Sequence, residues 1–68
     1  MKINVNGEER LIPCNKNISL NETMKLLGYS SNTVVVELNN LIINSEEWES
    51  KNIKDGDKFE IVSIVGGG

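Results

Sequence analysis

The sequence contains no histidine and only one cysteine, Cys14. Histidine is the usual general base near neutral pH and the commonest protein ligand of zinc, so both roles lack their standard side chain. A single cysteine forms neither an internal disulfide framework nor a cysteine-based metal site. These shortages argue against an enzyme that performs acid–base or zinc chemistry with its own side chains.

Positive charge and long apolar runs are scarce as well. The chain has 7 Lys and Arg against 10 Asp and Glu, a net charge of −3, whereas nucleic acids and anionic membranes attract concentrated positive charge. No stretch approaches the roughly 20 apolar residues that span a bilayer, and the first residues lack the apolar run of a signal peptide. We therefore expect a cytoplasmic protein without a nucleic-acid or membrane partner.

What is present suffices for one small folded domain. Hydrophobic residues make up 38% of the chain and charged residues 25%, as in soluble globular proteins. A chain of this length buries only about 60% of its unfolded surface, which leaves no room for an enclosed active-site cavity beside a core.

The first half of the chain predicts a hairpin followed by a helix. Met1, Ile3 and Val5 alternate with polar residues, as in a strand with one buried face, and Asn6-Gly7 favours a type I′ turn. The apolar residues 11–14 are the expected returning strand, and Pro13, which cannot donate to a ladder, is expected at a sheet edge or at the end of this strand. A capping box then predicts a helix from Ser19 to Gly28, and its buried face is expected to hold Leu20, Met24 and Leu27.

The second half predicts three strands. They cover residues 33–36, 41–43 and 58–65, with a helical turn near 45–48 and a turn at 54–57. Glu60 decides which face of the last strand packs against the helix, because an unpaired buried carboxylate is costly. Phe59 and Ile61 are therefore expected to face the helix, and every second residue from Glu60 onward is expected to lie on the open face. Exposed aliphatic side chains are common on any protein surface, but a cluster beside the C-terminus favours a docking site for a partner, with the predicted residues Val62, Ile64 and Val65.

The chain ends on three glycines directly after an apolar strand. Glycine is costly to order, so we expect residues 1–65 to form the domain and residues 66–68 to form a flexible tail. Three extended residues reach roughly 10 Å, far enough for Gly66 and Gly67 to thread the carboxylate of Gly68 into another protein's active site.

With these motifs, the chain resembles the ubiquitin-like β-grasp proteins, and more closely the sulfur-carrier family of thiamine biosynthesis. The resemblance covers the Asn6-Gly7 hairpin, the helix from Ser19 to Gly28, the turn at residues 55–57 and the terminal Gly67-Gly68. It implies an α+β fold: a mixed sheet of four to five strands with one main helix packed across it. The first and last strands are expected to pair in parallel at the middle of the sheet.

The resemblance also implies a function. The protein would be a co-substrate, not an enzyme: an adenylating enzyme would activate the Gly68 carboxylate, and a donor such as a cysteine desulfurase would supply sulfur. The resulting thiocarboxylate would pass its sulfur to thiazole synthase. This chain itself would bind no cofactor, because MgATP would bind the activating partner and the glycine tail lacks the lysine and following helix of a P-loop.

Two other functions stay open. The small subunit of molybdopterin synthase would use the same tail chemistry on another acceptor, although the short loop at residues 29–32 argues against it. A β-grasp interaction module with an unreactive tail is the alternative from a different class.

Three side-chain features also have two interpretations each. Cys14 is a sulfur relay or, with no basic neighbour in sequence, a small apolar residue near the core. Trp48 is a partner contact or a cap over the core. The acidic residues Glu46, Glu47 and Glu49 form a solvated face or steer the protein toward a basic partner surface.

Overall fold

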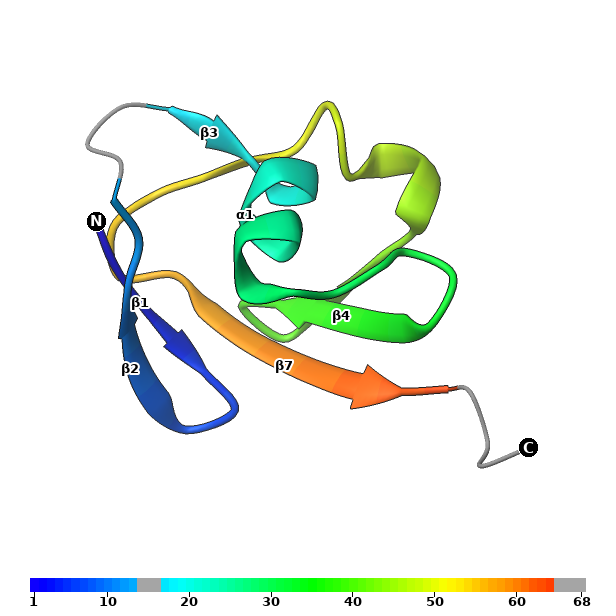
Figure 1. Cartoon of the computed structure of the whole chain (residues 1–68), viewed down its shortest axis with the longest axis horizontal. Coiled ribbons are helices and arrows are strands. Elements are labelled where there is room, and N and C mark those ends of the chain that lie inside the picture. Colours follow the sequence, from blue (N-terminus) through cyan, green and yellow to red (C-terminus); the bar gives the residue numbers. More distant parts are fainter. Residues whose placement is uncertain (14–16, 65–68) are drawn as a thin grey trace.

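The computed structural model describes residues 1–13 and 17–64. One helix, α1, lies across one face of a five-stranded sheet (Figure 1). The elements are β1 (Lys2–Val5), β2 (Glu8–Leu11), β3 (Ile18–Ser19), α1 (Leu20–Leu27), β4 (Val34–Leu38), β5 (Leu41–Ile43), the short 3-10 helix η1 (Ser45–Glu47), β6 (Asn52–Ile53) and β7 (Lys58–Ser63).

The main sheet has the strand order β2-β1-β7-β4-β5. β7 runs parallel to β1, and the pairs β1–β2, β4–β7 and β4–β5 are antiparallel. The last strand therefore occupies the centre of the sheet, between the first strand and β4. This confirms the expected α+β architecture with a mixed sheet, one main helix and parallel pairing of the first and last strands.

The first hairpin has the predicted turn but a different returning strand. Asn6 and Gly7 have φ angles of 52° and 87°, the positive values of a type I′ turn. Because this two-residue turn fixes the register, Glu8 already pairs with Val5, and β2 covers Glu8–Leu11. Of the strand predicted at residues 11–14, only Leu11 belongs to β2, and Cys14 lies outside the described residues. The prediction placed the strand too late, because it followed apolar composition where the edge strand is mostly charged.

The helix begins and ends at the predicted residues. The Ser19 hydroxyl accepts a hydrogen bond from the Glu22 N–H at 3.0 Å, and Gly28 ends the helix in the left-handed region at φ 90°. Leu20 and Met24 are fully buried, whereas Leu27 is only partly buried. Ser19 also belongs to β3, which pairs with β6 in a separate two-stranded sheet that the sequence did not predict.

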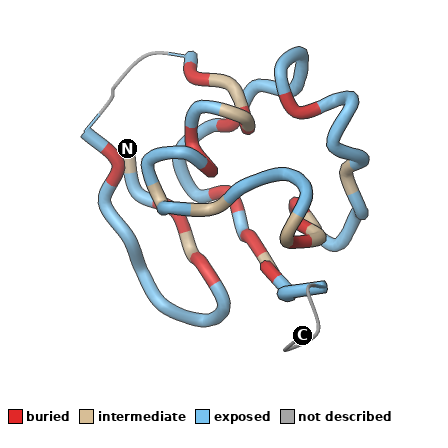
Figure 2. Tube along the Cα trace, turned by 45° about the vertical axis from the view of Figure 1, so that its right-hand side comes forward, coloured by how far each residue is buried: buried red, intermediate tan, exposed pale blue. Residues whose placement is uncertain are grey.

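The core lies between α1 and the sheet (Figure 2). Buried positions alternate with half-buried or exposed positions along β4 and β7, so one face of each strand packs against the helix. Trp48 is 2% exposed, and its Nε1–H donates to the Ile43 carbonyl at 3.2 Å. Burial of the whole indole agrees with the interpretation of Trp48 as a cap over the core.

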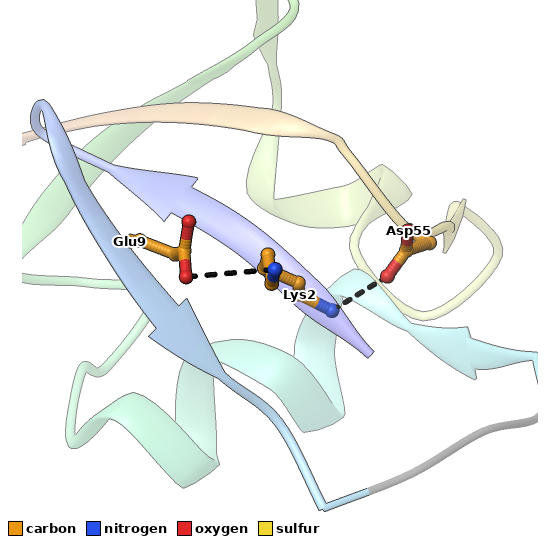
Figure 3. A network of polar contacts seen from close by, with 3 residues as sticks. All are labelled: Lys2, Glu9 and Asp55. Carbon is orange, nitrogen blue, oxygen red and sulfur yellow. Dashed lines mark hydrogen bonds and ion pairs between the residues drawn. The ribbon is translucent and has the colours of Figure 1, made fainter.

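Polar contacts at Lys2 join the start of β1 to the loop before β7 (Figure 3). The Lys2 N–H donates to Asp55 Oδ1 at 2.7 Å, and the Gly56 N–H donates to the Lys2 carbonyl at 2.7 Å. The Lys2 ammonium lies 3.7 Å from the Glu9 carboxylate on β2. The loop that leads into β7 is thus tied to β1, which helps to set the position of the central strand.

Candidate functional site: the open sheet face at the end of β7

The last strand presents its two faces as the sequence predicted. Phe59 and Ile61 are 0% and 8% exposed and pack in the core, whereas Val62 and Ile64 are 61% and 56% exposed. Glu60 is half-buried on the same face as Val62. Two aliphatic side chains therefore face solvent where β7 ends.

Two further residues extend this apolar surface. Val35 is directly opposite Val62 across the β4–β7 pair, and Ile42 of β5 is exposed one strand further on. We call Val35, Ile42, Val62 and Ile64 the open-face patch. Neither Val35 nor Ile42 was predicted from the sequence. The run of valines in β4 contains no polar residue to show which face Val35 takes, and Ile42 joins the patch only through the pairing of β5 with β4. Glu37 could have shown the face of Val35: because side chains alternate along a strand, a Glu37 that faces solvent places Val35 on the same, open face.

A hollow of about 180 Å³ lies at the corner of this patch. Its apolar lining comes from β4, β5, Trp48 and the end of β7, and comprises Val34, Val35, Ile42, Ile43, Trp48 and Ile64. This volume is enough for a single apolar side chain of another protein. The hollow lies where the open-face patch meets the core residues Val34 and Trp48.

Two carboxylates border the patch. Glu37 on β4 pairs in register with Glu60 on β7, two residue pairs along from Val35 and Val62 and therefore on the same face. On its other side, Glu37 pairs with Ile42 of the patch. Among the described residues, neither carboxylate forms an ion pair. The face thus combines an apolar region with a local pair of negative charges.

Backbone and side-chain hydrogen bonds fix the end of β7 from both sides. The Ile64 N–H donates to the Thr33 carbonyl at 2.9 Å, which continues the pairing with β4. On the side of β1, the Asn6 side chain bonds to the backbone of Ile61. The point from which the chain leaves the sheet is therefore set by the domain.

Several predicted residues lie outside the described part of the chain. These are Cys14 and the C-terminal residues Val65, Gly66, Gly67 and Gly68. Glu46, Glu47 and Glu49 are described and exposed around η1. Within residues 1–13 and 17–64, no three His, Cys, Asp or Glu side chains gather as a metal site, and no helix is long and apolar enough to cross a membrane.

A comparison with protein families gives one decisive match. The model of the ThiS family matches residues 3–68, nearly the whole chain. The chain belongs to the ThiS family. Its general role is therefore that of a sulfur carrier in thiamine biosynthesis.

A solved structure agrees in fold over the entire length. The crystal structure of the thiamine biosynthesis protein ThiS from Geobacter metallireducens superimposes with a TM-score of 0.83 at 29% identity. The match covers 100% of both chains. The ubiquitin-like β-grasp fold expected from the resemblance is thus confirmed.

Two curated relatives differ in length. The protein ycf40 from Trieres chinensis is 39% identical over 64 residues, which cover 94% of this chain and 85% of that protein. A thiazole synthase from Paramagnetospirillum magneticum is 39% identical over 72 residues, which cover 100% of this chain but only 20% of that protein. That thiazole synthase therefore contains a segment similar to this ThiS family chain within a much longer polypeptide.

Proposed function

We propose that this ThiS family protein carries sulfur as a thiocarboxylate on Gly68 and delivers it to thiazole synthase. The observation that carries the proposal is the open-face patch beside the end of β7, in a chain of the ThiS family. A docking surface next to the reactive end lets a partner enzyme hold the domain while it acts on the tail.

The chemistry starts from an unreactive group. A carboxylate repels nucleophiles and has no good leaving group, so a partner must activate it. One Gly68 carboxylate oxygen attacks the α-phosphate of MgATP on the adenylating enzyme, forms an acyl-adenylate and releases pyrophosphate. The terminal sulfur of a persulfide donor, such as a cysteine desulfurase, then displaces AMP and leaves an acyl disulfide on Gly68. A second thiol attacks the donor sulfur of that S–S bond, forms a disulfide with the donor cysteine and releases the thiocarboxylate of Gly68.

In this proposal the folded body binds and the tail reacts. Val62 and Ile64, with Val65 next in the chain, contact the partner through their apolar side chains. Gly66 and Gly67 pass through a channel too narrow for residues with side chains. The chain acts as a protein co-substrate, and the MgATP is bound by the adenylating partner.

Thiazole synthase is the proposed acceptor of the sulfur. The thiazole synthase of Paramagnetospirillum magneticum has a segment similar to this chain, and that relationship favours a functional association between the two kinds of protein. The ThiS family match likewise favours the thiamine pathway over the small subunit of molybdopterin synthase.

Intact-mass analysis tests the proposal. The protein is incubated with MgATP, a sulfide source and its adenylating enzyme, beside a carrier of known activity. We expect a mass gain that equals the replacement of one oxygen by one sulfur, located on the C-terminal peptide. An unchanged mass, with the control carrier converted, would leave only a β-grasp interaction module.

A further inference from the structure

We propose that Asn6 is a modification site: its side-chain amide is lost by spontaneous deamidation, the fold slows this reaction, and the product loosens the hold of the first hairpin on β7. The inference does not depend on the carrier function proposed above. It rests on the residue that follows Asn6 and on the hydrogen bonds that occupy both reacting groups.

Asn6 is the only asparagine of the chain that is followed by a glycine. Deamidation begins when the backbone nitrogen of the next residue loses its proton and attacks the side-chain carbonyl carbon, which expels ammonia and closes a succinimide ring. A side chain on the next residue hinders this attack, whereas glycine has none. Water then opens the ring at either of its carbonyls and leaves aspartate or isoaspartate, so the net reaction consumes water and releases ammonia.

The folded structure occupies both groups that have to react. The Asn6 amide is held by the Ile61 backbone, whose N–H donates to Oδ1 at 2.7 Å and whose carbonyl accepts from Nδ2 at 3.2 Å. The Gly7 N–H, which supplies the attacking nitrogen, donates to Asn4 Oδ1 at 3.0 Å. Turning the Asn6 side chain toward the Gly7 nitrogen breaks both contacts with Ile61, so the reaction requires a local opening of the hairpin.

Hydrogen bonds, and not burial, protect this site. Asn6 and Gly7 are both exposed, so water reaches the succinimide as soon as it forms. Besides the contacts of its amide, the Asn6 N–H donates to the Phe59 carbonyl of β7 at 2.9 Å. The rate of deamidation in the folded protein therefore reports how often the hairpin turn separates from β7.

The product loses contacts with Ile61. Aspartate has no donor for the Ile61 carbonyl and places a negative oxygen beside it. Isoaspartate runs the backbone through the former side-chain carbon, so its carboxylate is attached directly to Cα and is too short to reach Ile61. Either product leaves β7 paired with β4 but weakens its attachment on the side of β1. Modified molecules therefore hold the end of β7 less firmly.

Peptide mass spectrometry tests the site, with the wild-type protein kept at mildly alkaline pH in native buffer or in urea. We expect the mass gain of an NH2-to-OH replacement at Asn6 before any other asparagine, at least about tenfold faster in urea. Asn4→Ala frees the Gly7 N–H and should speed deamidation of the folded protein about threefold. Asn44→Ala, at an exposed residue whose side chain forms no cap hydrogen bond, is the matched control and should leave the rate unchanged.

The consequence is measured at the Ile61 amide. The isoaspartate form is separated by anion exchange after refolding, and its Ile61 N–H should exchange with deuterium at least about tenfold faster than in wild type. The Asn39 N–H, which bonds to the Lys58 carbonyl on the other side of β7, should be unaffected. Asn6→Asp needs no refolding, and its urea midpoint should lie below that of Asn44→Asp, which adds the same charge at an exposed asparagine.

Four outcomes would overturn the inference. Equal rates in native buffer and urea would show that the fold does not protect Asn6, and earlier reaction at another asparagine would place the site elsewhere. Equal rates for Asn4→Ala and Asn44→Ala would contradict the protection at Gly7. If Ile61 exchanges no faster and Asn6→Asp unfolds at the same urea concentration as Asn44→Asp, the modification leaves β7 attached.

Discussion

The side chain of Asn6 pairs with both backbone polar groups of Ile61. Its Oδ1 accepts from the Ile61 N–H at 2.7 Å, and its Nδ2 donates to the Ile61 carbonyl at 3.2 Å. β1 ends at Val5, so β7 would otherwise lose its neighbour on that side at this residue. The amide thus substitutes for one more residue of strand and holds β7 where it approaches the open-face patch.

Replacing Asn6 should therefore lower the free energy of unfolding through two separable effects, the loss of its hydrogen bonds and strain in the backbone. Asn6→Ala loses both hydrogen bonds and adds strain at φ 52°, for an expected loss of about 2–3 kcal/mol in the free energy of unfolding. Asn6→Gly loses the bonds without the strain and should cost about 1–2 kcal/mol. Urea denaturation measures both, and a Gly variant as stable as wild type would show that the amide contacts contribute nothing.

The helix cap offers a second test of stability. Ser19→Ala removes the acceptor of the Glu22 N–H and should lower the free energy of unfolding by about 1 kcal/mol. Ser31→Ala is the matched control, because Ser31 is exposed and outside the helix. Equal unfolding midpoints for the two variants in thermal denaturation would contradict a stabilising role for the cap.

Local signals explain why most of the fold could be predicted from the sequence. Asn6-Gly7, the Ser19 cap and Gly28 each impose a backbone geometry that few other residues adopt, so their positions are readable without tertiary information. The central place of β7 and its parallel pairing with β1 were assumed from the order of the elements, since no local pattern specifies them. The side chains of β7 that face the core could be predicted from Glu60, because burying its unpaired charge would be costly.

Tertiary pairing explains what could not be predicted. β3 and β6 are two residues long each, and their pairing places Ile18 directly beside Ile53 with both side chains buried, which no local pattern records. For a similar reason, only two of the four residues of the open-face patch could be predicted from the sequence. Val62 and Ile64 followed from the parity of their own strand, whereas Val35 and Ile42 join them through the register of β4 with its neighbours.

Deleting Gly68 should separate function from stability. The proposed reactive carboxylate would move one residue closer to the domain and fall short of the activating site, so sulfur loading should be lost. The thermal midpoint should change by less than about 1 °C, because the buried hydrophobic residues of the described part of the chain run from Ile3 to Ile61 and form a core among themselves. A large drop in the midpoint would show that the glycines contribute packing.

Changing Ile64 to Glu should weaken partner binding and leave the fold intact. Ile64 is 56% exposed, so a charge there meets water in the free protein but an apolar surface in the complex. Leu26→Glu is the matched control, since Leu26 is also 56% exposed but lies on α1. We expect the dissociation constant to rise about tenfold or more for Ile64→Glu alone. Equal weakening by both variants would place the interface elsewhere.

Trp48 can report docking at the hollow directly. It is the only tryptophan of the chain and lines the hollow together with Ile64, so a fluorotryptophan-labelled protein gives a single fluorine resonance. Adding the unlabelled adenylating enzyme should shift this resonance, because a side chain that enters the hollow changes the contacts of the indole. The Ile64→Glu protein, at concentrations too low for it to bind, should show no shift. A complex that forms without any shift would mean that the partner leaves the hollow empty.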